Sequence, residues 1–242
     1  AYEPEGTKVS LSVNCNAPAS ERSPHYLVLD VITDGTAAGV KNEGYNSGIP
    51  LYMGKSYKLK LRARADKETA VKVSIVSAVG DVYDSASFML GSEWSEYSAV
   101  LTAAKDDHSA RFLISMDTTG RACFDFVSLF PEDTYKGREN GLRRDIAEYL
   151  EALHPKFMRF PGGCLIHDGS LNKDDRDSTY RWKNTLGDVM NRPPRRNNWR
   201  YNQTLGLGYY EYFLFCEDIG AEPLPVLPAG YNPHSGQGVP ID

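Results

Sequence analysis

The sequence has no apolar run of about 18 or more residues, the length that a bilayer-spanning helix needs, so it predicts no membrane span. Cysteine is scarce, and Cys15, Cys123, Cys164 and Cys216 are too scattered for a disulfide framework or a metal knuckle. Each is most simply a small buried residue, although a bridge between Cys15 and Cys123 remains an alternative. Excess positive charge is also lacking. A net charge of −5 gives no support for binding to nucleic acid or anionic membranes.

The chain also lacks an initiator methionine and a leader of the secretory kind at Ala1-Tyr2-Glu3-Pro4-Glu5-Gly6. We therefore expect a chain that is processed or cut from a longer one. Its 242 residues suffice for one large domain or two ordinary ones, and a hydrophobic content of 41% is enough to build cores.

Residues 1–131 show repeated two-residue alternation of polar and apolar side chains. In Lys55–Ala65 apolar residues alternate with lysine and arginine, as in a strand with one wet face. Turn signals such as Asp34-Gly35 and Gly80-Asp81 separate such segments, and no helical periodicity intervenes. The pattern predicts an all-β jelly roll or β-sandwich of eight or nine strands. The other strands are expected at Lys8–Cys15, His25–Thr33, Ala70–Val79, Ser85–Leu90, Glu96–Ala104, Ala110–Asp117 and Arg121–Phe130, with a weaker one at Ala38–Tyr45.

Residues 132–242 follow a different pattern. Helical periodicity predicts an amphipathic helix over Asn140–Leu153 and an apolar one over Gly208–Ile219, closed by Gly220. Strands are expected at Lys156–Phe160 and Ala221–Leu227. This order is typical of a parallel α/β array, and we expect two or three units of a partial (β/α)₈, TIM-type barrel. The long segment 161–206 would leave the carboxyl end of a strand, where such barrels hold their chemistry.

The stretch Phe157-Met158-Arg159-Phe160-Pro161-Gly162-Gly163-Cys164 is the most informative part of this second region. An apolar run closed by Pro-Gly-Gly predicts a buried strand. A buried arginine needs a partner or a ligand, because an unpaired buried charge is costly. Two glycines allow close approach of a ligand or another backbone.

Several spaced motifs together resemble the glycoside hydrolase family 51 α-L-arabinofuranosidases. They are Asn140-Gly141-Leu142-Arg143, the Phe157–Cys164 stretch, Tyr180-Arg181-Trp182-Lys183-Asn184 with Gly187, Gly206–Tyr212, and Cys216–Pro223. The first region is similar to the carbohydrate-binding-like jelly roll that one branch of this family inserts after its first barrel strand. Its cues are Ser23–Leu27, Ala38–Gly44, Glu93-Trp94 and Asp125–Phe130.

The resemblance implies removal of terminal α-L-arabinofuranosyl residues from arabinan- or arabinoxylan-type glycans with retention of configuration. Retention uses two carboxylates about 5–5.5 Å apart. In the family these are glutamates on later barrel strands, and we find no counterpart, because Glu211 and Glu217 fall on a helix and Glu222 begins a strand. We therefore expect part of a glycosidase without its catalytic pair, inactive alone. The family also suggests a periplasmic or extracellular enzyme and a homo-oligomer formed through the parent protein.

The resemblance carries three substrate-binding candidates over to this sequence. Arg159 matches an arginine at the floor of the arabinose subsite, where its fork would orient a carboxylate. Alternatively, it holds a neighbouring carboxylate without touching sugar. Cys164 stands where many members have an arabinose-binding asparagine, and cysteine is a weaker donor. Trp182 would form an aromatic wall beside the sugar, or would simply pack under its own loop.

Other signals are weaker. Asp125 suggests a structural Ca²⁺, as in similar jelly rolls, although one acidic residue is not a site, and we expect no other cofactor. His167-Asp168 looks like a dyad but lacks a nucleophile. Basic residues in 176–200 fit a solvated loop or sugar contacts better than nucleic acid. Aromatic residues of the expected jelly roll would either stack on sugars or fill the core. These residues are Tyr45, Tyr52, Tyr83, Trp94 and Tyr97.

Two alternative functions remain for the chain. One is a non-catalytic carbohydrate-binding module, and the other is another retaining glycosidase such as a β-xylosidase.

Overall fold

The structure is a computed structural model that describes residues 1–35, 37–139, 141–234 and 237–238. The chain forms two compact units. The first comprises Ala1–Ala19 and Pro24–Arg144, and the second comprises Ser20–Ser23 and Asp145–Asp242. Within the described ranges, every helix is too short or too polar to cross a bilayer.

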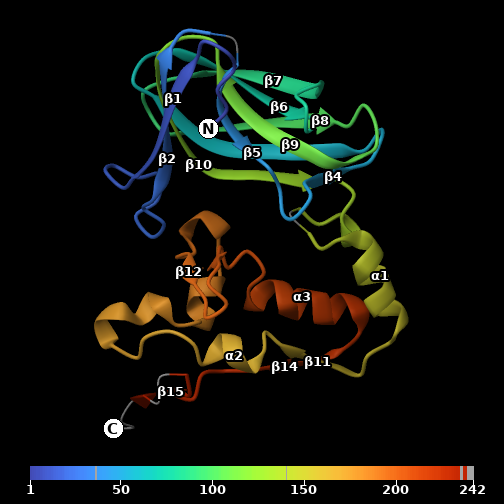
Figure 1. Ribbon diagram of the computed structural model, residues 1–242. Coiled ribbons are helices and arrows are strands. Elements are labelled where there is room, and N and C mark those ends of the chain that lie inside the picture. The colour runs from blue at the N-terminus through green and yellow to red at the C-terminus, as the bar shows by residue number, and fades with distance from the viewer. Residues whose placement is uncertain (36, 140, 235–236, 239–242) are drawn as a thin grey trace. The chain divides into compact units, whose positions relative to one another are not determined.

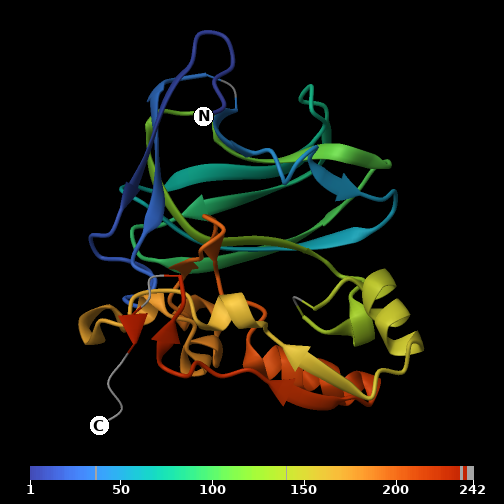
Figure 2. The ribbon, with the colours of Figure 1, turned by 60° about the horizontal axis from the view of Figure 1, so that its bottom comes forward.

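The first unit is built from two antiparallel five-stranded sheets (Figures 1 and 2). One sheet has the order β1 (Lys8–Asn14), β2 (Tyr26–Thr33), β10 (Gly120–Pro131), β5 (Ser56–Ala65) and β8 (Ser95–Thr102). The other has the order β3 (Ala38–Asn42), β9 (Asp107–Met116), β6 (Thr69–Val76) and β7 (Val82–Leu90), with β4 (Ile49–Leu51) also paired to β9. The prediction of a mostly β first region is confirmed.

The core of this unit lies on the inward faces of the strands. Strand β5 alternates strictly, with Leu59 and Leu61 buried and the intervening lysine and arginine side chains partly exposed. Strand β6 contributes Val71, Val73 and Ile75 to the same cluster. Two-residue alternation therefore places one face of each strand in a shared apolar layer, as the sequence pattern predicts.

Each predicted strand of the first unit is present, with ends shifted by a few residues. Strand β4 was not predicted, because three residues that include Pro50 give too little alternation to recognise. Cys15 lies just beyond β1 and is exposed, whereas Cys123 is buried in β10. All four cysteines are free, so the alternative of a Cys15–Cys123 bridge is not realised.

The second unit combines short helices with short strands. Its longer elements are α1 (Arg144–Ala152), β11 (Phe157–Phe160), α3 (Tyr209–Ile219) and β14 (Glu222–Pro225). Between β11 and α3 lie α2 (Gly163–Ile166), the 3₁₀ turns Lys173–Ser178, Trp182–Thr185 and Val189–Asn191, and the small pair β12 (Arg195–Arg196) and β13 (Asn202–Gln203). A last antiparallel pair joins β15 (Tyr231–Asn232) to β16 (Gln237–Gly238), and the remainder of the loop expected at 236–242 lies outside the described residues. A further 3₁₀ turn, Tyr135–Gly137, belongs to the first unit.

Helix α3 shows why its sequence forms a helix at this position. At its start, the Glu211 carboxylate accepts a hydrogen bond of 2.7 Å from the Gly208 backbone N–H. At its end, Gly220 adopts the left-handed conformation, with φ of 68°, and its N–H bonds back to the last turn. The predicted helix end and the role of Gly220 are confirmed, and the helix begins one residue later than predicted, at Tyr209, with Gly208 as its N-cap.

Helix α1 differs from its prediction in extent and burial. It begins at Arg144, and the predicted start at Asn140 lies outside the described residues. Its apolar face is exposed, since Ala147 is its only buried residue, while Ile146, Tyr149 and Leu150 face solvent. The periodicity therefore predicts the helix correctly, but no other described part of the chain packs against its apolar face.

Strands β11 and β14 run parallel, with Phe157 opposite Glu222 and Phe160 opposite Pro225. Helix α3 packs beside both strands (Figure 1). The parallel pairing agrees with the predicted α/β array, but the prediction that β11 is a buried strand is wrong. Only Phe160 is buried, because β11 has a single strand neighbour among the described residues and its other flank remains open.

Candidate functional site

The carboxyl end of β11 and the segment that follows it carry the predicted site residues. Arg159 is exposed, and across the described ranges no hydrogen bond or ion pair reaches its guanidinium group. The expectation of a buried arginine with a partner is therefore wrong for this chain. Next to it, Gly162 has φ of +132°, a conformation that favours glycine, and turns the chain from β11 into α2.

Cys164 lies on α2 and is exposed. Its Sγ atom and ligand nitrogens of His167 and His234 all lie within 4.8 Å of one another. The sequence singles out His167 only as the neighbour of Asp168, and it does not single out His234. No sequence pattern links His234 to Cys164, because His234 lies 70 residues further along the chain and approaches α2 only through the segment that follows β14.

Trp182 opens the 3₁₀ turn Trp182–Thr185 and is 42% exposed. The Nζ atom of Lys183 lies 5.7 Å from the centre of its ring, a cation–π arrangement. The carbonyl of Trp182 accepts a hydrogen bond of 2.8 Å from the hydroxyl of Thr185. The exposed ring is available to a ligand, although Trp182 does not line either of the hollows described below.

Arg192 is buried inside the segment between β11 and α3, which the sequence had suggested to be a solvated loop. Its guanidinium donates to both carboxylate oxygens of Glu211, at 2.7 and 3.0 Å. It also donates to the carbonyls of Gly187 and Leu205, at 2.8 and 2.7 Å. A forked cation held by a carboxylate and two carbonyls fixes this loop against the start of α3.

Arg195 forms the second buried pair of this segment, and its side chain has no exposed surface. Its Nη2 atom donates to Asp168 at 2.8 Å, and Nε and Nη1 donate to the carbonyls of Ser178 and Leu165. Burial lowers the pKa of Arg195, and the Asp168 carboxylate opposes that shift. Asp168 also accepts a hydrogen bond from the backbone N–H of Asn198, so the carboxylate is committed to these contacts.

These two pairs correct the expectation for the basic residues of 176–200. Arg192 and Arg195 are neither solvated nor turned toward a ligand, because each has a carboxylate partner outside that stretch. Sequence reasoning missed the pairs since Glu211 and Asp168 lie 19 and 27 residues away from their arginines. Hydrophobic periodicity carries no information about such polar contacts.

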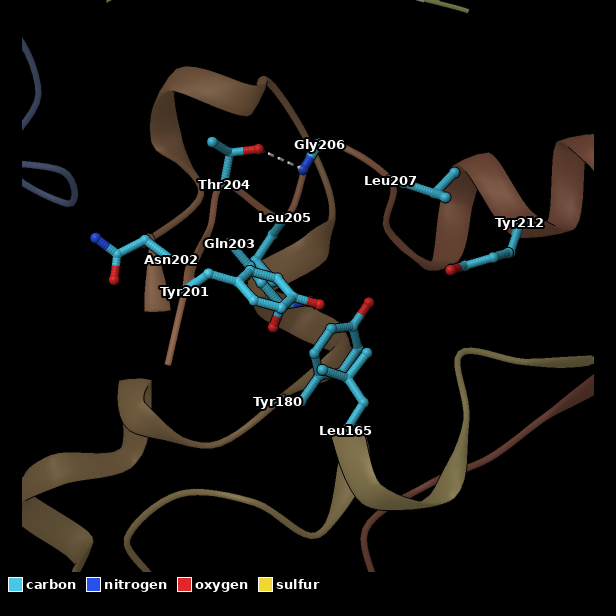
Figure 3. Close-up of a pocket in the computed structure, with 10 residues that line it drawn as sticks. All are labelled: Leu165, Tyr180, Tyr201, Asn202, Gln203, Thr204, Leu205, Gly206, Leu207 and Tyr212. Carbon is cyan, nitrogen blue, oxygen red and sulfur yellow. Dashed lines mark hydrogen bonds between the residues drawn. The ribbon is translucent and has the colours of Figure 1, made fainter. Parts of the chain in front are cut away.

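A hollow of about 310 Å³ opens beside the aromatic core of the unit (Figure 3). Tyr180, Tyr201 and Tyr212 line it, and Figure 3 shows their rings turned toward it from three segments. Phe160 stacks on Tyr212 with ring centres 4.8 Å apart. The residues that complete the lining are Leu165, Asn202, Gln203, Thr204, Leu205, Gly206 and Leu207.

Burial raises the pKa of three tyrosines of this region, Tyr180, Tyr209 and Tyr212. Burial raises the pKa of Tyr180 well above its usual range, and Tyr212 adds to the effect. Burial also raises the pKa of Tyr209 to about 12, and the Tyr209 hydroxyl donates to the carbonyl of Val226. The hollow therefore offers neutral hydroxyl and aromatic surfaces, which suit an uncharged polar ligand better than an ion.

A second hollow of about 390 Å³ lies at the carboxyl end of α2. His167 and Asp168 line it together with Tyr231, which belongs to β15. Gly169, which follows His167 and Asp168 in the chain, has φ of +101°. A Cβ atom at this position would come within 2.3 Å of the Ser178 carbonyl oxygen. Glycine is therefore required at this position, where the backbone passes close to Ser178.

Asp125 in β10 was the candidate for a structural calcium site. One of its carboxylate oxygens accepts from the Phe126 N–H at 2.9 Å, and the other is buried without a partner. Burial raises its pKa to about 6. Calcium takes six to eight oxygen ligands, and in the described part of the chain no group of three or more acidic or cysteine and histidine side chains includes Asp125. Asp125 therefore has no partner ligands of these side-chain types among the described residues, and the calcium site stays a prediction.

The aromatic candidates of the first unit separate into two groups. Trp94 packs edge-on against Tyr26 with ring centres 5.1 Å apart, and Tyr83 donates to Asp107. Tyr97 packs partly buried against the core. In contrast, Tyr45 and Tyr52 are 86% and 50% exposed, which leaves their rings open to a ligand.

The second unit matches a known family of proteins, and most of the chain is similar to individual members of that family. Residues 149–241 match the family model described as "Alpha-L-arabinofuranosidase 1 domain". An extracellular exo-α-L-arabinofuranosidase of Streptomyces chartreusis is 42% identical over 223 residues, which are 90% of this chain and 26% of that protein. α-L-Arabinofuranosidase 1 of Arabidopsis thaliana is 34% identical over 88% of this chain and 32% of that protein.

A solved structure shows the same likeness. An arabinose-bound α-L-arabinofuranosidase of glycoside hydrolase family 51 superposes with a TM-score of 0.85 and 30% identity, over 96% of this chain and 38% of that chain. The chain therefore spans about a quarter to two fifths of the length of these relatives. The resemblance predicted from the Phe157–Cys164 stretch and the other spaced motifs is confirmed: over most of its length the chain is similar to part of the glycoside hydrolase family 51 α-L-arabinofuranosidases.

Proposed function

We propose that this chain supplies part of the substrate-binding face of a retaining α-L-arabinofuranosidase. The enzyme would release terminal α-L-arabinofuranosyl residues from arabinose-containing polysaccharides such as arabinan or arabinoxylan. In this proposal the parallel strands β11 and β14 are two neighbouring strands of a (β/α)₈ barrel, and the first unit is a carbohydrate-binding-like jelly roll. Residues 132–242 would form the part of the barrel, and residues 1–131 would form the jelly roll.

The single observation that carries the proposal is the open carboxyl end of β11. It presents an exposed, unpaired arginine beside a glycine turn, inside the segment that matches the arabinofuranosidase domain. A forked guanidinium without a partner within the described residues suits a carboxylate supplied by another part of the whole protein. Arg159 would then orient a catalytic carboxylate and donate to the sugar.

The surrounding residues support this role by their rigidity. The buried pairs Arg192–Glu211 and Arg195–Asp168 hold the segment that follows β11 in one arrangement. A binding face needs such support, because small displacements of substrate-contacting groups cost large factors in rate. Cys164 and Trp182 would contact the sugar from this fixed segment, Cys164 as a weak donor and Trp182 as an aromatic wall.

The two catalytic glutamates would come from sequence other than residues 1–242. Glu211 is committed to Arg192 and to the start of α3, so it is not a free carboxylate for a sugar. We therefore expect the isolated chain to leave an aryl α-L-arabinofuranoside intact. Turnover by this chain that a point mutation within 132–242 abolishes would refute the placement of the pair elsewhere.

The decisive test uses the whole protein with an aryl α-L-arabinofuranoside as substrate. Replacing Arg159 by alanine should lower kcat/KM by roughly 10²–10³-fold, as expected for a lost electrostatic contact at the reacting centre. Arg159→Lys should recover little, because a point charge cannot replace the fork. Proton NMR of the first-formed arabinose should show the α-anomer, the retained configuration.

The matched control is Arg121→Ala, which removes an exposed arginine of the first unit that pairs with Asp30. This variant should keep the activity of the wild type. Equal activity of Arg159→Ala and Arg121→Ala would overturn the assigned role of Arg159, and a β-configured first product would overturn the retaining mechanism. Faster hydrolysis of an aryl β-xyloside than of the arabinofuranoside would favour the alternative of a β-xylosidase.

A second candidate function, glycan binding by the first unit, has one favouring observation. Tyr45 and Tyr52 expose their rings, as sugar-stacking aromatics do. Calorimetry of the full chain with arabino-oligosaccharides should show millimolar or tighter binding that Tyr45→Ala with Tyr52→Ala removes. Unchanged binding by that variant, or none by the wild type, would reject this function.

Two broader properties of the whole protein belong to the same proposal. A periplasmic or extracellular location is favoured by the Streptomyces relative, whose name states that it is extracellular. A homo-oligomer, formed through the parent enzyme, is expected from the family resemblance. Fractionation of the source cells and sedimentation of the whole protein would decide these two points.

A further inference from the structure

Three side chains with metal-binding atoms meet beside α2. Cys164 and His167 are three residues apart on one helical turn, so their side chains share a face. His234 comes from the segment after β15. The Sγ atom and the imidazole nitrogens of these residues all lie within 4.8 Å of one another. We propose that Cys164, His167 and His234 form a binding site for a thiophilic divalent transition-metal ion, with zinc as the best fit.

The approach of His234 to the other two residues is fixed by specific contacts. The Nδ2 atom of Asn232 donates to the carbonyl of Gly169 at 2.7 Å, which ties β15 to the segment that follows α2. The Oδ1 atom of Asn232 accepts from the His234 backbone N–H at 2.9 Å. Asn198 contacts the His234 ring at Nε2, at 3.3 Å. Outer contacts of this kind hold a histidine ligand in its orientation.

One nitrogen of the cluster has no hydrogen-bond partner in the described structure. The Nε2 atom of His167 is buried and has no hydrogen-bond partner among the described residues. An unpartnered buried nitrogen is costly unless a ligand satisfies it. The rings of His167 and His234 meet edge to face with centres 5.0 Å apart, which leaves their nitrogens near the thiol.

The donor set selects the class of ion. One thiolate and two imidazoles favour zinc, cobalt, cadmium or copper over calcium and magnesium, which prefer oxygen. With Zn–S of about 2.3 Å and Zn–N of about 2.0–2.1 Å, tetrahedral donors lie about 3.4–3.6 Å apart. Cys164 and His234 are exposed and are free to close the remaining distance of about 1 Å.

The coordination would keep an open position. Asp168, the nearest carboxylate in sequence, is committed to Arg195 and to the backbone of Asn198 and Gly169. His167 lines the hollow of about 390 Å³, which gives an ion and a fourth, exogenous ligand a way in. Three protein ligands with one open position are typical of exchangeable rather than structural zinc. Because Cys164 is also a proposed sugar contact, a bound ion would compete with arabinose at that residue.

Cobalt substitution tests this site on the full chain without any measurement of activity. Titration with Co²⁺ should give a thiolate-to-cobalt charge-transfer band in the near ultraviolet, and intense visible bands of a tetrahedral ion, saturating at one equivalent. Zn²⁺ should displace the cobalt. Cys164→Ser should abolish the charge-transfer band, and His167→Ala or His234→Ala should weaken binding roughly 10–100-fold.

The matched controls are Cys15→Ser and His154→Ala, which remove an exposed cysteine and an exposed histidine away from the cluster. Both should leave the titration unchanged. Cys164 is exposed, so its serine variant should keep the circular dichroism of the wild type. Absence of the band in the wild type, or a band that persists in Cys164→Ser, would overturn the proposal. Binding of arabinose is not needed for any of these readouts, so a failed glycosidase assignment would leave the site standing.

Discussion

The two units bury their apolar side chains in different ways. In the first unit, two sheets close over a continuous layer to which β5, β6 and β9 all contribute. In the second unit, a small aromatic core lies around Phe160 and Tyr209, while the outer faces of α1, β11 and β14 remain exposed among the described residues. The comparison teaches that alternating strands complete a core by themselves, whereas the short elements of the second unit depend on buried polar pairs.

The largest expected effect concerns one of those pairs. Arg195→Ala leaves Asp168 nearly buried and without its cation, which should cost about 3–5 kcal/mol of unfolding free energy. Hydrogen exchange measured by mass spectrometry at increasing urea should show early opening of peptides from 157–225. Peptides from the first unit should keep their protection.

The exposed pair Arg121–Asp30 of the first unit is the matched control. Arg121→Ala should cost at most about 1 kcal/mol, because solvent screens a surface pair. If both variants lost stability equally, the second unit would not depend on its buried pair. Loss of protection in the first unit of Arg195→Ala would show that the two units unfold together.

The second effect concerns the apolar core of the first unit. Leu59→Ala deletes a fully buried side chain from β5 and should cost about 2–5 kcal/mol. The same change at Leu224 in β14, which is half exposed, should cost less than about 1 kcal/mol. Urea denaturation followed by circular dichroism would compare them. A cost at Leu224 as large as that at Leu59 would show that the outer face of β14 is covered in solution.

The same contrast explains how much of the fold the sequence could predict. Alternation in segments such as Lys55–Ala65 located the strands of the first unit, since burial of one face is a local property of each strand. In the second unit, helix α3 was predictable because Gly220 and an apolar run define it. The burial of β11 was not predictable, because it depends on which strands lie beside it rather than on its own residues.

The candidate site shows the same limit. The Phe157–Cys164 motif identified the family and the position of Arg159, since a motif is contiguous in sequence. The pairing of Arg195 with Asp168 and the approach of His234 to Cys164 depend on residues far apart in the chain. No hydrophobic period marks such contacts, and only the folded segment between β11 and α3 brings them together.

A smaller effect, on pH dependence, concerns Asp125 of the first unit. Its folded pKa is about 6, raised by burial, whereas an unfolded aspartate has a pKa of about 3.9. The folded state therefore binds the proton more tightly, and stability from this group falls as pH rises from about 4 to about 6. Asp125→Asn should stabilise the first unit at pH 7 by about 1–2 kcal/mol, after allowance for partial solvent exposure, and hardly at all at pH 4.

Asp107 of the same unit provides a control of opposite sign. Its pKa is lowered, chiefly by the hydrogen bond from Tyr83, so its contribution is present above the unfolded pKa and is lost as pH falls. Asp107→Asn should therefore destabilise the unit at pH 7. Urea midpoints at pH 4 and pH 7 would compare the two variants. A destabilised Asp125→Asn at pH 7 would contradict the buried, unpaired state of that carboxylate.

The smallest effect on stability concerns the exposed face of α1. Tyr149→Ser in α1, combined with Leu153→Ser directly after the helix, changes two side chains that face solvent, so the unfolding free energy should change by less than about 0.5 kcal/mol. Uncovered apolar surface promotes association, and sedimentation velocity at rising concentration should show less self-association of this variant than of the wild type. Val79→Ser, an equally exposed change in the first unit, should leave association unchanged. A wild-type chain that sediments as a monomer at all concentrations would show that the second unit, like the first, completes its surface by itself, and the contrast between the units would then be one of core size alone.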